Sequence, residues 1–236
     1  MGKRLIHQRR GSGHPQYRTP SHRHTDDVRQ PPIENGEGKV LDLVHAPGRS
    51  SPLALVDFDG DKDYVLAAEG MSVGQTISVG SGRVAVGNVL TLSTIPEGTH
   101  VHNIEKIPGD GGIFVKAAGT SAQVVSRGAV VVLQMPSGQM KEFHPNCRAS
   151  VGIVAGHGRP DKPFAKSGKK FHAYRSKAKA YFKVSGVAMN AVDHPHGGGS
   201  HRHVGKPSTK SRNAWPGQKV GRLSPKKRKG GKSKRR

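Results

Sequence analysis

The sequence predicts an all-β fold of two small barrels with a long basic extension at each end. Its main evidence is a series of short aliphatic and β-branched runs between Lys39 and Val154, separated by turn residues. No helical period persists between Lys39 and Leu92, and strands at this short spacing favour barrels in a small body. We expect an N-terminal extension at 1–35, a first barrel at 36–85, a second barrel at 86–160 and a C-terminal extension at 161–236.

Each of these runs predicts a β-strand of roughly four to eight residues. The strands of the first barrel and the start of the second are expected at 39–46, 52–58, 63–68, 76–80, 83–95, 100–107 and 112–118. Asp59-Gly60, Ser81-Gly82 and Gly111-Gly112 are typical of tight turns between them. A hairpin is expected from 123–135 and 138–143 around Pro136-Ser137-Gly138, followed by a strand at 148–154.

The charge of the chain predicts a polyanionic partner. The formal net charge is +23, with 39 lysines and arginines against 16 aspartates and glutamates, which leaves nucleic acid and anionic membrane as partner classes. Residues 36–115 are net acidic, whereas from Arg159 onward only Asp161 and Asp193 oppose more than twenty lysines and arginines. A folded body with basic arms accounts for this segregation.

Other features of the composition exclude several classes of protein. No run approaches the ~18 apolar residues that a membrane-spanning helix needs, so we expect no membrane partner. Arg9 and Arg10 interrupt the N-terminal segment, so we expect no secretory signal. The single Cys147 excludes an internal disulfide and is typical of a reducing compartment.

The two extensions are rich in residues that pair with phosphate. In the first, arginines and lysines alternate with glycine and proline, which predicts an arm that is a disordered tail in isolation and becomes ordered on RNA. In the second, Lys169–Phe182 predicts a short basic helix. The aromatic residues near it are either platforms for stacked bases or contacts that dock the segment on its own domain. The tail from Ser224 is typical of either a nuclear import signal or an RNA-binding tail.

The prediction of function depends mainly on the segment Gly186–Lys206. It has no apolar periodicity after Val192, so it predicts neither an ordinary helix nor a half-buried strand, and we expect it to find little to pack on within its own chain. Gly197, Gly198 and Gly199 lack a Cβ atom and let the backbone approach another surface closely. Backbone N–H groups and neutral histidines in such a loop suit the phosphates and sugars of RNA.

The same histidines suggest two other interpretations. His194, His196, His201 and His203 suggest a zinc site, but no cysteine lies nearby and Asp193 is the only carboxylate of the loop. Asp193 beside His194 suggests a general base, but adjacency in sequence does not align two side chains, and no nucleophile motif accompanies them. The prediction is therefore no metal, no catalytic residue and no enzymatic activity.

Several blocks of the sequence resemble one known family. They are GVAMNAVDHPHGGG from Gly186, the following HRHVGKPSTKSRNAWPGQKVG, PEGTHVHNIEKIPGDGG from Pro96, AGTSAQ from Ala118, MPSGQMKEF from Met135, CRASVGIVAGHGRPDKP from Cys147 and the N-terminal MGKRLIHQRRGSG. In this order they resemble the universal large-subunit ribosomal protein known as protein two, in its archaeal and eukaryotic branch.

The resemblance implies a fold, a function and a set of partners. The first barrel would be of the oligonucleotide-binding type and the second SH3-like. The protein would be a structural constituent of the large ribosomal subunit in the cytoplasm, supporting subunit association, tRNA positioning and the peptidyl transferase region. Its partners would be large-subunit ribosomal RNA, other ribosomal proteins and the small subunit, with no cofactor and with Mg²⁺ only in the RNA environment. His194 would be a structural support, with direct proton transfer as a minor alternative.

Residues expected to contact RNA come from both extensions and from two short segments of the second barrel. Arg127 and Lys116 are expected beside Arg148 on the RNA-facing edge of that barrel. The complete predicted set is Lys3, Arg4, Arg9, Arg10, Arg18, Arg23, Gly119, Thr120, Ser121, Arg148, Lys169, Lys170, Met189, Asn190, His194, His196, Gly197, Gly198, Gly199, Arg202, Lys206, Lys210 and Arg212.

Overall fold

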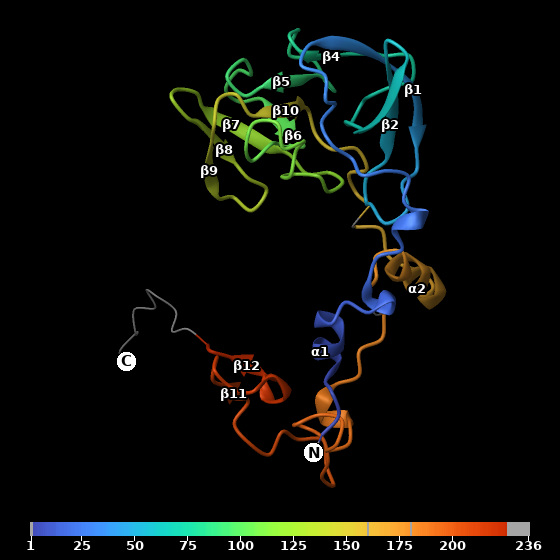
Figure 1. Cartoon of the computed structure of the whole chain (residues 1–236), viewed down its shortest axis with the longest axis vertical. Helices are drawn as coiled ribbons and strands as arrows, with labels where there is room; N and C mark the ends of the chain where they lie inside the picture. The colour runs from blue at the N-terminus through green and yellow to red at the C-terminus, as the bar shows by residue number, and fades with distance from the viewer. Residues whose placement is uncertain (1, 160, 180, 226–236) are drawn as a thin grey trace. The chain divides into compact units, whose positions relative to one another are not determined.

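The chain separates into two compact units in a computed structural model that describes residues 2–159, 161–179 and 181–225. Unit 1 consists of Met1–Thr19 with Ala178–Arg236, and unit 2 is Pro20–Lys177 (Figure 1). Each of the two sequence extensions therefore has one part in unit 1 and one part in unit 2.

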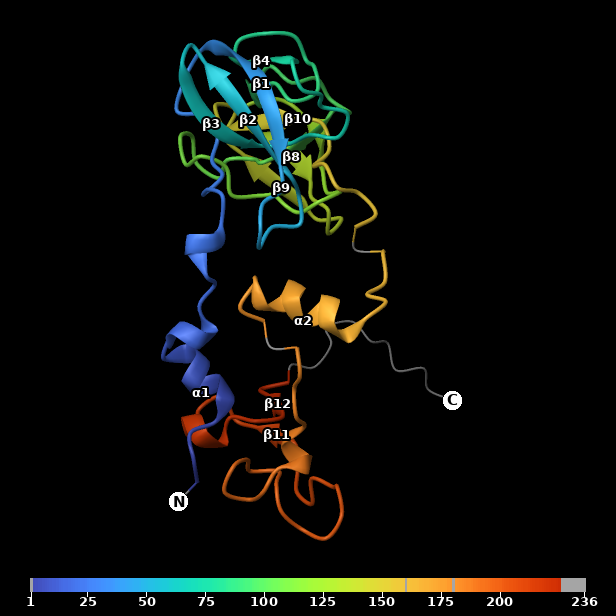
Figure 2. The same ribbon diagram turned by 90° about the vertical axis from the view of Figure 1, so that its right-hand side faces the viewer.

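Unit 2 is built on a ten-stranded sheet, so the prediction of a mostly β protein is confirmed. The strands are β1 (Gly36–Val44), β2 (Leu53–Phe58), β3 (Asp61–Leu66), β4 (Thr76–Gly80), β5 (Val89–Thr91), β6 (His100–His102), β7 (Ala122–Ser126), β8 (Val131–Gln134), β9 (Met140–Phe143) and β10 (Arg148–Val151). Their order in the sheet is β3-β2-β1-β4-β5-β10-β6-β7-β8-β9. The first three of these, β3, β2 and β1, lie side by side in Figure 2. β4 and β5 pair in parallel and the other neighbours are antiparallel.

The predicted turn at Asp59-Gly60 sets the register of the first hairpin. It joins β2 to β3 with Phe58 opposite Asp61, and both turn residues have positive φ, 52° and 102°. Two-residue hairpin loops favour this conformation because its twist matches that of the strands.

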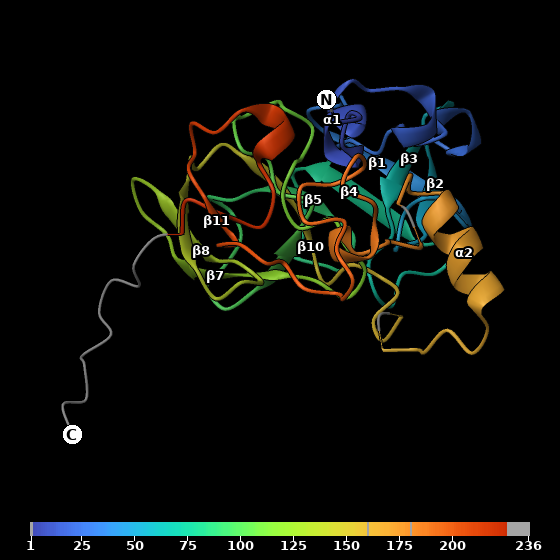
Figure 3. The same cartoon turned by 90° about the horizontal axis from the view of Figure 1, so that it is seen from below.

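The apolar core changes within β5, which lies beside β10 (Figure 3). Val89 belongs to a cluster with Val56 and Ile77, whereas Leu90 belongs to a second cluster with Leu133. Because successive residues of a strand face opposite sides, one short strand contributes to both cores.

Cys147 is buried in the second cluster, and burial raises the pKa of its thiol.

Four predicted strands differ markedly from the structure. The run 83–95 forms a strand only at β5, 100–107 only at β6, and 112–118 forms only a single bridge between Ile104 and Phe114. The run 123–135, predicted as one arm of a hairpin, divides into the paired strands β7 and β8. Gly111, Gly112 and Val115 have φ of 79°, 85° and 56°, which extended backbone does not allow.

Short helices and turns make up the rest of the described chain. The predicted basic helix is α2 (Ser167–Arg175), and it is followed by Ala178 with a non-helical φ of 51°. In unit 1 are α1 (Ile6–Gly11), 3₁₀ turns at Pro15–Tyr17, Gly186–Ala188 and Pro216–Gln218, and a parallel pair of β11 (Thr209–Lys210) with β12 (Arg222–Leu223). A further 3₁₀ turn, Ser21–Arg23, lies in unit 2.

Over the described residues, no helix has the length and apolar character to cross a membrane.

A buried histidine makes the stability of unit 2 depend on pH. His102 is 0% exposed, its Nδ1–H donates to the Gly152 carbonyl at 3.1 Å, and burial lowers its pKa from 6.5 to about 4. The unfolded chain takes up a proton near pH 6.5 and the folded chain does not, so stability is complete above that pH and falls towards pH 4.

We therefore expect the free energy of unfolding to fall by about 1 kcal/mol between pH 7.5 and 5.5 through His102 alone. Urea titrations of the full chain at the two pH values measure this change. His102→Gln should remove that part of the pH dependence, whereas His144→Gln, at an exposed position, should leave it unchanged. Equal pH dependence in His102→Gln and the unsubstituted chain would contradict the assignment.

Candidate nucleic-acid interface

In unit 1 the N-terminal arm is fixed to the glycine- and histidine-rich segment. The backbone N–H of Lys3 donates to the Val192 carbonyl at 2.9 Å, and Lys3 Nζ lies 3.0 Å from Asp193 Oδ1. Leu5 is buried, and its N–H donates to Gln8 Oε1 at the start of α1. Two segments from opposite ends of the sequence thus form one surface.

Most of the cations predicted to contact RNA are exposed, each within its own unit. Among the predicted residues, exposed side chains are those of Lys3, Arg4, Arg9, Arg10, Arg18, Arg202, Lys206 and Arg212 in unit 1, and Arg23 and Lys169 in unit 2. Lys210 and Lys170 are half-buried. Lys3 pairs with Asp193, but the chain has too few carboxylates to neutralise the exposed arginines of the arm, so these arginines are suited to binding phosphates.

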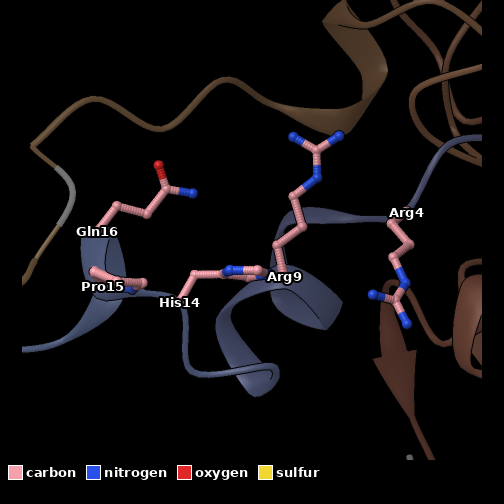
Figure 4. A pocket seen from close by; sticks show the side chains of 5 residues that line it. All are labelled: Arg4, Arg9, His14, Pro15 and Gln16. Carbon is pink, nitrogen blue, oxygen red and sulfur yellow. The ribbon is translucent and has the colours of Figure 1, made fainter.

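Two cavities lie along the arm. One, of about 490 Å³, is lined by Arg4, Arg9, His14, Pro15 and Gln16. In it the two guanidinium groups extend in different directions (Figure 4). The other, of about 440 Å³, includes Lys3, Arg4 and Arg9 together with Met189, Asn190 and Asp193. The second cavity places Met189 and Asn190 beside Arg4 and Arg9, and all four residues are among those predicted to contact RNA.

The triglycine segment packs on its own loop, so the expectation that it would find little to pack on is wrong. Gly197 N–H donates to the His194 carbonyl at 2.9 Å, and Gly198 N–H donates to the Met189 carbonyl at 3.0 Å. A Cβ atom at Gly197 would lie 2.5 Å from the Met189 carbonyl oxygen. The missing Cβ at Gly197 is therefore required inside the loop, while Gly198 and Gly199, with φ of 84° and 89°, remain exposed.

The histidines divide into a packed pair and an exposed pair. His196 is 9% exposed and its ring lies 5.1 Å from that of half-buried His194, edge to face. The His196 N–H donates to His194 Nδ1 at 3.0 Å, so that nitrogen is unprotonated. Burial, with the charges of His196 and His7, lowers the pKa of His194. These contacts favour a neutral, structural His194.

The alternatives for this loop find no support in the geometry. The carboxylate of Asp193 pairs with Lys3 and therefore does not serve as an orienting partner for a histidine. His201 and His203 are exposed, and His203 Nδ1 donates to the His201 carbonyl at 2.9 Å. Within the described ranges, no group of three or more histidines, cysteines or carboxylates is placed to hold a metal ion.

The segment Gly119–Ser121 forms a turn whose hydroxyl groups bond within unit 2. Thr120 Oγ1 donates to the Ala117 carbonyl at 2.6 Å, and Ser121 Oγ lies 3.1 Å from His100 Nδ1. Gly119 has a φ of 70°, and a Cβ there would lie 2.8 Å from His157 Nδ1. The glycine is explained by this packing.

Arg148 is used inside the protein. Its Nη2 lies 3.1 Å from Glu105 Oε1, and its Nη1 donates to the carbonyls of Pro31 and Ile33 at 2.9 and 3.1 Å. These contacts hold the segment before β1 to β10. Because the guanidinium of Arg148 is bonded within the protein, its surroundings give no support to RNA contact by this residue.

The two other cations predicted for this edge also have partners within unit 2. Lys116 Nζ donates to the carbonyls of Val28 and Gly112 at 2.7 and 2.9 Å, and burial, followed by the charges of Arg49 and Arg29, lowers its pKa. Arg127 Nη1 donates to the Ser93 carbonyl at 3.0 Å.

Sequence reasoning missed one cavity of unit 2, of about 860 Å³. It lies between the loop His45–Ser50, the residues near Phe164 and α2. Of its lining residues only Lys169 belongs to the predicted RNA-binding set. The sequence does give one signal for it, because Phe164 is among the aromatic residues mixed with closely spaced cations that were interpreted as either platforms for bases or docking contacts.

Comparison with known proteins gives matches along nearly the whole chain. Residues 2–79 match the family described as "Ribosomal Proteins L2, RNA binding N-terminal domain", and residues 85–216 match "Ribosomal Proteins L2, C-terminal domain". The chain is 54% identical over 229 residues to large ribosomal subunit protein uL2 of Archaeoglobus fulgidus, covering 95% of this chain and 97% of that protein. It is 53% identical to the proteins of the same name from Picrophilus torridus and Thermoplasma acidophilum, each covering 97% of this chain and 98% of the relative.

Proposed function

Because this chain belongs to the uL2 family of large ribosomal subunit proteins, we propose that it clamps segments of large-subunit ribosomal RNA within the assembled particle. The observation that carries the proposal is the joining of the arm to the glycine- and histidine-rich segment through Lys3, which displays arginines from both ends of the chain on one unit. Phosphates crowd together in folded RNA, and cations inserted among them reduce their mutual repulsion.

In this proposal the RNA contacts of unit 1 come from the arm and the loop. The exposed cations of the arm bind phosphates, the exposed backbone of Gly198 and Gly199 approaches the RNA, and neutral His194 supports the loop. Met189 and Asn190 lie at the entrance of that loop, beside a cavity that also contains Arg4 and Arg9. The RNA performs peptide-bond formation, and this segment supports the region in which it occurs.

We propose the finer fold and partners on the same basis. Residues 36–85 would form a barrel of the oligonucleotide-binding type and 86–160 an SH3-like barrel, flanked by the extensions 1–35 and 161–236. The apolar core changes between Val89 and Leu90, close to this boundary, which supports the division. Beyond RNA, the partners would be other ribosomal proteins and, across the subunit interface, the small subunit, with effects on subunit association and tRNA positioning.

Sedimentation of cell lysate through a sucrose gradient tests the function. After a high-salt wash, we expect the protein to migrate with the large subunit, since an integrated clamp is held by many contacts. Binding to RNA at low salt would be weaker evidence, because any chain of this charge binds polyanions there. A protein found only in free fractions would instead be a soluble nucleic-acid-binding regulator, and the proposal would be wrong.

A further inference from the structure

The cavity of about 860 Å³ in unit 2 has one wall that is held by contacts within the folded unit. One wall is the loop His45–Ser50, in which Ser50 Oγ accepts a hydrogen bond from Ala118 N–H at 3.0 Å. Gly48 of this loop has a φ of 84°, and a Cβ there would overlap the His24 imidazole. The opposite wall is α2, so the cavity lies between a loop bonded to the turn at Ala118 and a helix.

The charge of this cavity selects an anion. Its described lining contains no carboxylate, and its cations are Arg49, Arg159, Lys162, Lys169 and Lys177. Arg49 is oriented from behind, since its Nη2 donates to the Asp26 carbonyl at 2.9 Å and lies 3.9 Å from Asp27 Oδ1. A phosphate is an anion that several such groups can bind together.

The same cavity also has an apolar wall suited to a flat ring. Phe164 is 52% exposed, and its ring lies 6.5 Å from that of Tyr174 with an interplanar angle of 34°. Pro47, Pro163 and Ala173 continue this wall. An exposed aromatic ring beside cations is the combination with which proteins hold unstacked bases.

We propose that this cavity receives one looped-out nucleotide of large-subunit ribosomal RNA, with its base on Phe164 and its phosphates against the surrounding cations. The inference rests on the proposed function and adds a single-nucleotide site to it. The volume falls in the range of roughly 300–1,000 Å³ that is typical of small-ligand sites, which admits a nucleotide but not a helix of paired RNA. Exposed Lys166, which precedes α2, and exposed Arg175, its last residue, bind the RNA backbone before and after this nucleotide.

The test is chemical footprinting of in vitro transcribed archaeal large-subunit rRNA with the full-length protein and two matched variants. Phe164→Ala removes the ring inside the cavity, and Phe171→Ala removes a similarly exposed ring, 45% against 52%, of α2 that does not line it. The unsubstituted protein and Phe171→Ala should protect the base of one unpaired nucleotide. In Phe164→Ala that base should become at least ~5-fold more reactive while the remaining footprint persists, and affinity should fall roughly 5- to 150-fold.

Phe164→Trp, which keeps a stacking surface, should restore the protection. Identical footprints for Phe164→Ala and Phe171→Ala would overturn the inference and leave the proposed function standing. Dialysis against the four nucleoside monophosphates separates a free nucleotide from a nucleotide of the RNA. Tight binding of one of them that is lost in Phe164→Ala, with an unchanged rRNA footprint, would also overturn it. If the unsubstituted protein gives no footprint at all, the proposed function fails as well.

Discussion

Glu105→Ala is expected to lower the free energy of unfolding of unit 2 by about 3–5 kcal/mol. The Glu105 side chain is 0% exposed, and its Oε2 accepts from the Arg148 and Gly109 backbone N–H groups at 2.8 and 3.2 Å. Its Oε1 accepts from Gly111 N–H and from Arg148 Nε and Nη2 at 3.3, 3.2 and 3.1 Å. Truncation leaves these donors and the Arg148 charge without their acceptor, and a buried charge that loses its partner is strongly destabilising.

Urea unfolding of the full chain at pH 7.5, followed by circular dichroism, measures this loss. The matched control is Asp27→Ala, which removes a 90% exposed carboxylate 3.9 Å from Arg49 and should cost less than ~0.5 kcal/mol. Glu105→Gln keeps the shape and one acceptor oxygen, so its effect should lie between the two. Equal stability of Glu105→Ala and Asp27→Ala would mean that the buried network does not hold β10 to the segment before β1.

This network could not be predicted from the sequence, because its partners are far apart along the chain. Arg148 bonds to the carbonyls of Pro31 and Ile33, and Glu105 lies in the run 100–107, in which nothing indicated that this carboxylate would be buried. The same residue types at the surface would have produced the same pattern. Charge composition therefore predicts that basic residues lie at the surface. It does not show that Arg148 is one of the exceptions, because its bonding partners are distant in the sequence.

The elements with a local physical cause were predictable. Asp59-Gly60 fixes a hairpin whatever surrounds it, and strands such as β2 and β8 follow from short aliphatic runs. The run 112–118 has equally suitable residues, yet left-handed backbone at Gly112 and Val115 prevents a strand. Such a conformation depends on packing around Asn103, whose side-chain oxygen would lie 2.5 Å from a Cβ at Gly112, and no pattern in the run indicates it.

The exposure of the predicted cations could be anticipated from composition, whereas the packing of the triglycine could not. The exposed arginines of the arm follow from composition, since no core requires them. The triglycine, by contrast, was interpreted as bare backbone for RNA, and at Gly197 the contact is with Met189 and Asn190 of the same loop. A glycine in a sequence indicates that another group lies close to its backbone, but it does not indicate whether that group belongs to the same loop or to RNA.

Gly197→Ala is accordingly expected to disrupt the loop itself and to weaken binding of the protein to large-subunit rRNA by up to ~100-fold. The new Cβ would lie 2.5 Å from the Met189 carbonyl oxygen, 2.6 Å from the Asn190 carbonyl carbon and closer still to the Asn190 carbonyl oxygen. Backbone atoms cannot rotate away as a side chain can, so the cost lies at the upper end of the ~1–3 kcal/mol that overpacking produces. Filter binding to in vitro transcribed rRNA at 150 mM salt measures the loss.

The control is Gly217→Ala, because a Cβ there meets nothing within 4 Å and neither glycine has a positive φ. Both variants carry the same charge and the same added methyl group, so electrostatic attraction to RNA is equal and only the steric contact differs. If Gly197→Ala binds as tightly as Gly217→Ala, the loop does not need its own compact fold to engage RNA. If instead Gly197→Ala loses affinity and proteases cut within residues 186–206 more rapidly, the loop acts as a prefolded element, because packing within it precedes contact with RNA.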